Sequence, residues 1–178
     1  MFINPQTAID KGWVTFPESM SEEQRKSCIQ PNALDITVDK IFAVNNEAVF
    51  VMSEDKKSHR GASLLKPDAN DDWYLHGKQS YDITSDFFVK VPSGVAVLLI
   101  IRSSFNRNGL FITSGLYDSG FEGSVGMMLH NMSGPALIKK GTRVCQLIFV
   151  TSESAGMYAG GYNTAVGQHW AATDKDTN

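Results

Sequence analysis

The stretch VAVLLIIRSS, residues 95–104, is the most informative part of this 178-residue sequence. Its first seven residues, Val95 to Ile101, form the longest uninterrupted apolar run in the chain and include several β-branched side chains. A short run of this kind predicts a strand that is covered on both faces. A membrane-spanning helix needs about 20 apolar residues, so the run is too short to cross a bilayer as a helix.

Alternating apolar and polar residues predict further strands on both sides of that run. Leu34 and Ile36 are separated and followed by polar residues, which is typical of a strand with one buried face. The same alternation recurs over 124–129 and 144–150, whereas 53–72 is acidic and indicates a surface hairpin. Turn residues separate the segments. Many short strands with little helix predict an all-β sandwich or jelly roll.

The two ends of the chain differ from this strand-rich middle. We expect a short N-terminal helix, because Asn4 can cap its first turn, Pro5 fits that turn and Gly12 can end it. Residues 156–178 are rich in Gly, Ala and Thr without periodicity, which predicts a tail that is mobile unless a ligand or a neighbouring subunit orders it. The sequence therefore predicts one domain over residues 1–155, followed by this tail.

Charge and cysteine content narrow the class of protein. The 16 Lys and Arg against 19 Asp and Glu give a formal charge of −3, which argues against a nucleic-acid coating protein but allows one phosphate pocket. Cys28 and Cys145 cannot build a disulfide framework and match no zinc spacing. A reducing compartment follows, and the N-terminus resembles no secretory signal. We therefore expect a cytoplasmic protein.

The apolar run ends in three polar residues, Arg102, Ser103 and Ser104, and Arg107 follows three positions later. A guanidinium and two hydroxyls at a fixed strand edge suit phosphate oxygens, because Arg offers a planar fork and hydroxyls add short hydrogen bonds. An ordinary strand end that enters a solvated turn is the alternative, and the spacing alone leaves it open.

The stretch GLYDSGFEG, residues 115–123, combines turn residues with chemically useful side chains. Asp118 could act as a general base beside bound phosphates, with Phe121 stacking on a sugar or base, or it could only stabilise its own turn. Further along, Gln146 is expected on the same core face as Val144 and Ile148. A polar residue there needs a partner in the core or in a ligand.

Together, the order and spacing of these blocks resemble the dUTPase and dCTP deaminase superfamily. The matching blocks are 30–35 (QPNALD), 91–94 (VPSG), 102–110 (RSSFNRNGL), 113–123 (TSGLYDSGFEG), Asn131 and 141–146 (GTRVCQ). The resemblance implies a distorted β jelly roll, the β-clip, that forms a homotrimer with active sites between subunits. It also implies a deoxyribonucleoside triphosphate substrate that carries Mg²⁺ on its phosphates, with no metal bound by protein ligands and no nucleic-acid partner.

Two chemistries occur in that superfamily, and one position separates them here. The dUTPase branch hydrolyses dUTP to dUMP and pyrophosphate with an Asp whose place resembles that of Asp118. The deaminase branch uses a Glu three residues before a strand-ending Asn that resembles Asn131, and Met128 stands there. A thioether cannot move protons, so the pattern favours a dUTP pyrophosphatase. The alternatives are a dCTP deaminase, a dCTP or modified-pyrimidine pyrophosphatase, and a non-catalytic nucleotide-binding module of the same fold.

The resemblance also implies a role for individual residues. Asp118 is the implied catalytic residue, which orients the attacking water. The implied substrate-binding residues are Arg102, Ser103, Ser104, Arg107, Thr113, Ser114, Gly115, Phe121, Gln146, Tyr158 and Tyr162. The sequence departs from the superfamily in three places. The segment between Arg107 and Asp118 is about two residues shorter than in the deaminase branch, and Gly161 stands where a phosphate-binding Lys is expected. The tail also contains no Arg-Gly-x-Gly-Gly-Phe-Gly motif of the dUTPase branch.

Overall fold

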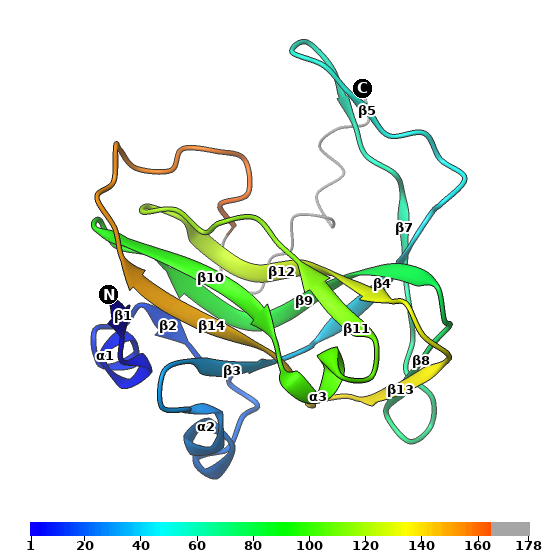
Figure 1. The fold of residues 1–178 in the computed structure, drawn as a ribbon, viewed down its shortest axis with the longest axis horizontal. Coiled ribbons are helices and arrows are strands. Elements are labelled where there is room, and N and C mark those ends of the chain that lie inside the picture. The colour runs from blue at the N-terminus through cyan, green and yellow to red at the C-terminus, as the bar shows by residue number, and fades with distance from the viewer. Residues whose placement is uncertain (165–178) are drawn as a thin grey trace.

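A computed structural model describes residues 1–164, which fold mainly as two antiparallel β-sheets packed face to face (Figure 1). One sheet joins β1 (Phe2–Ile3), β14 (Arg143–Thr151), β10 (Val95–Ile101) and β3 (Leu34–Thr37). The other joins β11 (Leu110–Thr113), β12 (Glu122–Asn131), β9 (Gln79–Lys90), β4 (Lys40–Val44), β7 (Ala62–Leu64) and β2 (Val14–Thr15). The expected all-β fold class is confirmed.

The core lies between the two sheets and follows the period of the strands. In β12 the buried residues are Val125, Met127 and Leu129, and the intervening side chains are partly exposed, as the alternation predicts. In β3, however, the polar residues Asp35 and Thr37 are buried as well as their apolar neighbours. The expectation of one exposed face is therefore wrong for β3, and its polar side chains need partners inside the protein.

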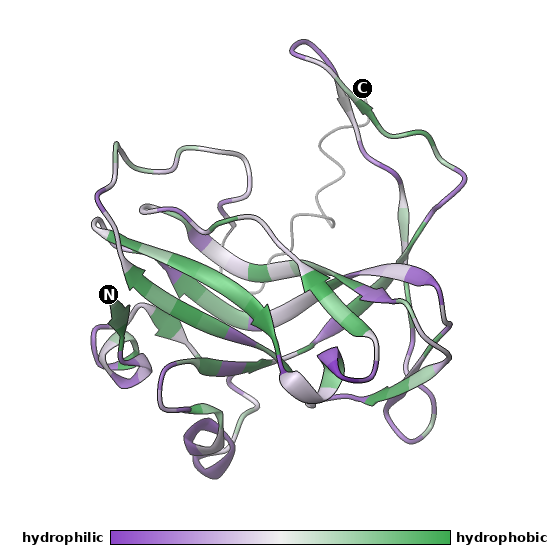
Figure 2. Cartoon of the chain, in the orientation of Figure 1, coloured by the Kyte–Doolittle hydropathy of each residue, from purple (hydrophilic) through white to green (hydrophobic). Residues whose placement is uncertain are grey.

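The apolar strand β10 is less covered than its composition predicts. Its first residues, Val95 and Val97, are buried, but Leu98 and Ile100 are 41% and 44% exposed. Figure 2 shows β10 and its neighbour β14 mainly in the hydrophobic colour. The prediction of a strand covered on both faces is thus wrong for the second half of β10 within one chain.

The strand β14 buries the face opposite to the expected one. Cys145, Leu147 and Phe149 are buried between the sheets, whereas Gln146 and Ile148 are half-buried on the opposite face. Gln146 therefore shares a face with Ile148, but the expectation that this is the core face is wrong. Both alternating sets of residues in β14 are mainly apolar, so alternation alone does not identify the face that enters the core. Val144 is buried next to Cys145, where the register with β3 shifts.

The N-terminal helix is confirmed as α1 (Pro5–Asp10). The Asn4 side chain accepts a hydrogen bond from the Gln6 backbone N–H, and Gly12 follows the helix in the left-handed region, at φ +68°. The structure also contains a second helix, α2 (Glu22–Cys28). It starts at Ser21 with a reciprocal capping box.

The remaining elements lie at the edges of the sandwich. They are α3 (Ser103–Asn106), the hairpin of β5 (Val51–Met52) with β6 (Lys57–Ser58), and the pair of β8 (Asp72–Leu75) with β13 (Ala136–Lys139). Figure 1 shows the β5–β6 hairpin projecting from the body, in line with the expected surface hairpin. Within residues 1–164, no helix has the length and hydropathy to span a membrane.

The expected tail is described only in its first part. Residues 156–164 run back across the turn that leads into β12, where the Tyr158 N–H donates to the Ser119 carbonyl oxygen at 2.7 Å. The rest of the expected tail, 165–178, lies outside the described residues. The predicted boundary at residue 155 therefore stays a prediction.

Candidate functional site

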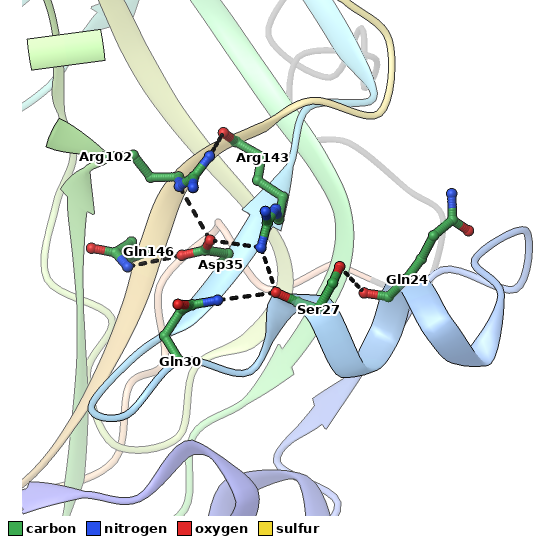
Figure 3. A network of polar contacts seen from close by, with 7 residues as sticks. All are labelled: Gln24, Ser27, Gln30, Asp35, Arg102, Arg143 and Gln146. Atoms are coloured by element: carbon green, nitrogen blue, oxygen red, sulfur yellow. Dashed lines mark hydrogen bonds and ion pairs between the residues drawn. The ribbon is translucent and has the colours of Figure 1, made fainter. Parts of the chain in front are cut away.

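A buried carboxylate organises the first cluster, at the end of β10 (Figure 3). Asp35 on β3 is 1% exposed and lies 3.1 Å from Nε of Arg102 and 3.3 Å from Nη1 of Arg143. Its other oxygen accepts a hydrogen bond of 2.8 Å from Nε2 of Gln146. The contacts form because β3 and β10 pair with β14 on either side, so their ends converge. The Asp35 carboxylate thus holds the side chains of Arg102, Arg143 and Gln146 in place.

The C-terminal end of α2 holds one of these cations, Arg143, from the other side. Arg143 donates through Nη1 to the Ser27 carbonyl, which also accepts a hydrogen bond of 3.0 Å from the Gln30 side chain. Arg102 donates to the Arg143 carbonyl at 3.0 Å. Carbonyls at a helix C-terminus carry negative partial charge, which stabilises a nearby guanidinium. The cluster is therefore rigid, while the Arg102 side chain remains 29% exposed.

The structure places the residues expected to bind phosphate as follows. Arg102 and Gln146 meet at Asp35, and Ser103 and Ser104 form the exposed first turn of α3 beside Arg102. Arg107 lies at the other end of α3 and is exposed. A guanidinium, an amide and two hydroxyls at one strand end can donate hydrogen bonds to several phosphate oxygens.

Sequence reasoning missed two members of this cluster, Asp35 and Arg143. Asp35 lies inside the block at 30–35, and Arg143 inside the block at 141–146, but neither was expected to bind substrate. A usable signal existed: a carboxylate in a strand beside apolar residues needs a cation if that strand is buried. The missing information was that β3 is covered on both faces.

The second cluster surrounds a cavity of about 530 Å³ between the β11–β12 connection and residues 158–164. Its described lining residues are Asp82, Thr113, Ser114, Gly115, Leu116, Tyr117, Phe121, Ser124, Gly126, Met127, Met128, Tyr158, Tyr162 and Thr164. Six residues expected to contact nucleoside or tail-side groups are among them, from Thr113 to Gly115 together with Phe121, Tyr158 and Tyr162. The size suits one small heterocyclic ligand.

Three aromatic rings build one side of this cavity. The rings of Tyr117 and Phe121 meet edge to face at 4.8 Å, and Tyr158 lies 6.0 Å from Phe121. The Tyr117 hydroxyl donates to the Gly126 carbonyl at 2.6 Å, and burial raises the pKa of Tyr117. Such rings give a ligand ring an apolar surface on which to pack.

Gly120 lets the tail approach the hairpin closely. It adopts φ +92°, and a Cβ at this position would come within 2.8 Å of the Tyr158 backbone nitrogen. Only glycine combines this backbone conformation with the space that the tail occupies. The contact between turn and tail is therefore encoded in the sequence as well as seen in the fold.

Asp118, the expected catalytic residue, is exposed at the turn and is not among the described lining residues of the cavity. Its backbone carbonyl accepts a hydrogen bond of 3.0 Å from the Phe121 N–H, so it does stabilise its own turn. Its chemical role stays a prediction.

The elements that carry the two clusters lie at opposite ends of β10: the connection between β11 and β12 runs beside its start, and α3 follows its end (Figure 1). Tyr117 pairs with Val97, near the start of the strand, and the Ser119 hydroxyl donates to the Val95 carbonyl at 2.7 Å. Arg102 follows the other end of β10. Five residues of extended strand separate Val97 from Arg102 by about 17 Å. The turn that carries Asp118 and the residue Arg102 are therefore set near opposite ends of β10 within one chain.

Other ionisable groups do not form a recognisable metal centre. Among residues 1–164, no group of three or more His, Cys, Asp or Glu side chains is arranged to hold a metal ion. His130, near the cavity, lies 2.8 Å from the Ser80 hydroxyl and 2.9 Å from the Thr113 hydroxyl, one through each ring nitrogen.

Comparisons with known proteins agree with the fold and with the blocks in the sequence. Residues 14–152 match the model of a family described as dCTP deaminase-like. A probable deoxyuridine 5'-triphosphate nucleotidohydrolase of Methanothermobacter thermautotrophicus is 27% identical over 135 residues, which are 75% of this chain and 87% of that protein. A dCTP deaminase, dUMP-forming, of Persephonella marina is 31% identical over 128 residues, 70% of this chain and 71% of that protein.

A solved structure shows the same fold. The dCTP deaminase of Agrobacterium tumefaciens superposes with a TM-score of 0.62 at 15% identity. The match covers 83% of this chain but only 46% of that chain. At this identity the likeness concerns the fold alone.

Proposed function

Since the chain belongs to the dCTP deaminase-like family, we propose that it hydrolyses a deoxyribonucleoside triphosphate, dUTP, to dUMP and pyrophosphate. The observation that carries the proposal is the pair of clusters on β10. One presents phosphate-binding donors around Arg102, and the other presents a cavity for a base beside the exposed carboxylate of Asp118. The relatives named above act on dUTP or dCTP, which supports a pyrimidine nucleotide as substrate.

The complete site requires two copies of the chain. The turn that carries Asp118 and the residue Arg102 are set near opposite ends of β10 within one chain, so a second subunit would supply one of them. Leu98 and Ile100 offer an apolar surface on β10 for such a contact. The closed arrangement proposed is a homotrimer in which each site joins the turn of one subunit to the β10 end of its neighbour.

The chain's own groups would then carry the reaction. Arg102 and Gln146 bind phosphate oxygens, and the hydroxyls of Ser103 and Ser104 add hydrogen bonds. The Asp118 carboxylate holds a water in line with the α-phosphorus and takes its proton as the oxygen–phosphorus bond forms. The bond from the α-phosphorus to the bridging oxygen breaks, and pyrophosphate leaves. Positioning and charge stabilisation supply most of the acceleration.

The remaining cavity residues would hold the nucleoside. The Phe121 ring packs on the deoxyribose, where a 2'-hydroxyl finds little room. The backbone of Thr113 to Gly115 hydrogen-bonds to the base, and Tyr158 with Tyr162 covers the bound nucleotide. Arg107, which is exposed at the end of α3, contacts the outer phosphates.

Mg²⁺ is proposed as part of the substrate, bound to the phosphate oxygens. The hydroxyls of Ser103 and Ser104 and the carboxylate of Asp118 are oxygen groups of the kind that can hydrogen-bond to the waters of such an ion. When bound, the ion neutralises phosphate charge. The proposed setting is the cytoplasm, in keeping with the two buried free thiols, Cys28 and Cys145.

A specific observation favours a second candidate, deamination of dCTP. Met128 occupies the place of the deaminase Glu, but the Asp82 carboxyl lies opposite it on the neighbouring strand and lines the same cavity. A carboxyl there could transfer protons at a bound cytosine.

One assay separates the candidates. Pyrophosphate release is measured from dUTP, dCTP, dTTP and dATP with Mg²⁺, together with ammonia release. Fast pyrophosphate release from a pyrimidine nucleotide without ammonia is the expected result. Ammonia from dCTP would favour deamination instead. A folded protein that binds nucleotide but releases neither product would be a binding module.

A further inference from the structure

The Asp82 carboxyl lies in the wall of the cavity without a polar partner in the part of the chain that the structure describes. It is 6% exposed on β9, and residues 1–164 form no hydrogen bond or ion pair with it. Its neighbours in register are apolar: Met128 on β12 and Phe42 on β4. Buried polar groups are nearly always hydrogen-bonded, because an unpaired one is costly. The carboxyl is therefore available to hydrogen-bond to a molecule bound in the cavity.

The surroundings of Asp82 restrict what that molecule can be. The same cavity is lined by the aromatic rings of Tyr117 and Phe121 on one side and by the backbone of Thr113 to Gly115 on another. Aromatic faces bind flat rings, and exposed backbone groups bind ring edges. A flat heterocycle with hydrogen-bonding groups on its edge fits both.

The protonation state of the carboxyl determines which edge it can bind. Burial raises the pKa of Asp82 to about 6, so the group is neutral in mildly acidic solution. A neutral carboxyl has one O–H donor and one free acceptor oxygen, whereas the ionised form only accepts. The pairing edge of a pyrimidine places a donor beside an acceptor, which complements the neutral form at two points.

We propose that Asp82 is a specificity-determining residue whose carboxyl binds the pairing edge of the pyrimidine through one donated and one accepted hydrogen bond. This inference rests on the proposed function, because it takes the bound molecule to be the nucleotide of that reaction. The carboxyl contacts the base rather than the phosphates, since the phosphate-binding cluster lies at the other end of β10.

Other ionisable groups face Asp82 and must be separated from it in any pH experiment. From the elements packed against it, they are Tyr117 on the turn, His130 on β12, Lys40 on β4, and Tyr158 and Tyr162 in the tail. Asp86 lies further along β9. Of these, His130 needs its own control, because its ring lies 2.9 Å from the hydroxyl of Thr113, which lines the cavity.

The test measures binding of α,β-imido-dUTP and α,β-imido-dCTP, each with Mg²⁺, between pH 5 and pH 8. The wild type is compared with Asp82→Asn, Asp82→Leu and His130→Gln. Because only the neutral form pairs fully, affinity of the wild type for the preferred analogue should fall about tenfold from pH 5 to pH 7 relative to Asp82→Asn. The phosphates also titrate in this range, and the comparison with Asp82→Asn removes their effect.

Each variant has a defined expected result. Asp82→Asn keeps a donor and an acceptor, so its affinity stays within about threefold of the wild type at pH 5. Asp82→Leu binds at least tenfold more weakly at pH 5, while its affinity for inorganic tripolyphosphate is unchanged. His130→Gln keeps the pH dependence of the wild type. Melting curves confirm that each variant is folded.

Two results would overturn the inference in distinguishable ways. If the wild type binds a nucleotide but Asp82→Leu binds it equally well, or if wild type and Asp82→Asn show the same pH profile, only the role of Asp82 is lost. If the wild type binds neither analogue at any pH, the proposed function is lost with it.

Discussion

The two buried carboxyl groups near the proposed site, Asp35 and Asp82, show how much a single side chain depends on its neighbours. Asp35 is enclosed by two guanidinium groups and an amide, so its charge is compensated at every oxygen. Asp82 is enclosed by apolar side chains, so its neutral form is favoured. Asp35 orders the side chains around Arg102 that are proposed to bind phosphate, and Asp82 is available to a ligand.

Asp35→Asn should lower the free energy of unfolding by about 3 kcal/mol, because it leaves two neighbouring guanidinium groups without a counter-charge. Chemical denaturation at neutral pH measures the change. Asp39→Asn is the matched control: Asp39 pairs with Lys40 and Lys140 at 3.7 and 4.0 Å near the surface, and such pairs contribute less than about 1 kcal/mol. Equal losses in the two variants would contradict the assigned role of Asp35.

Asp82 should make the protein less stable as the pH rises. The pKa of its carboxyl is raised from 3.8 to about 6 in the folded chain. The unfolded chain therefore releases the proton first, so the stabilising contribution is complete below pH 3.8 and is lost as the pH rises through 6. A shift of about two pKa units corresponds to a change of roughly 3 kcal/mol in the free energy of unfolding. Relative to the wild type, Asp82→Asn should gain stability between pH 4 and pH 7.

The measurement is denaturant unfolding of both proteins at a fixed protein concentration across that pH range, without nucleotide. A stability difference that stays constant with pH would show that Asp82 does not retain its proton on folding.

For strands and helices, the sequence predicted the position of an element and the alternation of its residues better than it predicted which faces of that element are covered. Alternation placed β12 correctly, and the caps around Asn4 and Gly12 placed α1. The strand β14 was assigned the wrong core face because apolar residues occupy both of its faces, so alternation alone does not distinguish them. The strand β3 was expected to be half-exposed because strand pairing on both sides of β14 is a long-range property.

In the candidate site, too, some features could be predicted from the local sequence and others depend on long-range contacts. Donor-rich blocks such as Arg102 to Ser104 could be recognised from residue type and spacing. That Arg102 faces Asp35, and that Asp118 lies outside the cavity of its own chain, depend on how distant strands meet. Contacts between strands that are distant in the sequence cannot be predicted from the local sequence alone.

The two cysteine thiols should react at different rates, because one lies at the end of a peripheral helix and the other in a central strand. Cys28 closes the short helix α2, whereas Cys145 lies in β14 between β3 and β10, and burial raises the pKa of both. Both should react far more slowly with a disulfide reagent than in denaturant, with Cys28 the faster because short elements open locally. Cys28→Ser and Cys145→Ser isolate each thiol. A faster reaction of Cys145 would contradict this order.

For the molecule as a whole, the proposed function implies that a single chain holds only part of the active site. The exposed half of β10 and the distance of about 17 Å between Val97 and Arg102 are both accounted for if several copies associate. Such an association would cover the apolar residues and complete the proposed site through the same contact.

Leu98→Glu should therefore weaken self-association without unfolding the chain, because Leu98 is 41% exposed in the single chain. Sedimentation equilibrium should give about three chain masses for the wild type and a lower mass for the variant. Val49→Glu is the control: it also replaces an exposed apolar residue, on the segment that leads to the projecting hairpin. Loss of assembly in both variants, or in neither, would contradict a contact through β10.

The most direct test of a shared site is complementation between two inactive variants. Asp118→Asn removes the proposed base, and Ser104→Glu places a negative charge beside the phosphate-binding cluster; both positions are exposed, so both variants should fold. Each alone should release pyrophosphate from dUTP at least a hundredfold more slowly than the wild type. Co-expressed in equal amounts, they should recover about one quarter of the wild-type rate, because a quarter of randomly formed neighbour pairs contain both intact groups. A mixture as inactive as its components would show that the two groups do not come from different subunits.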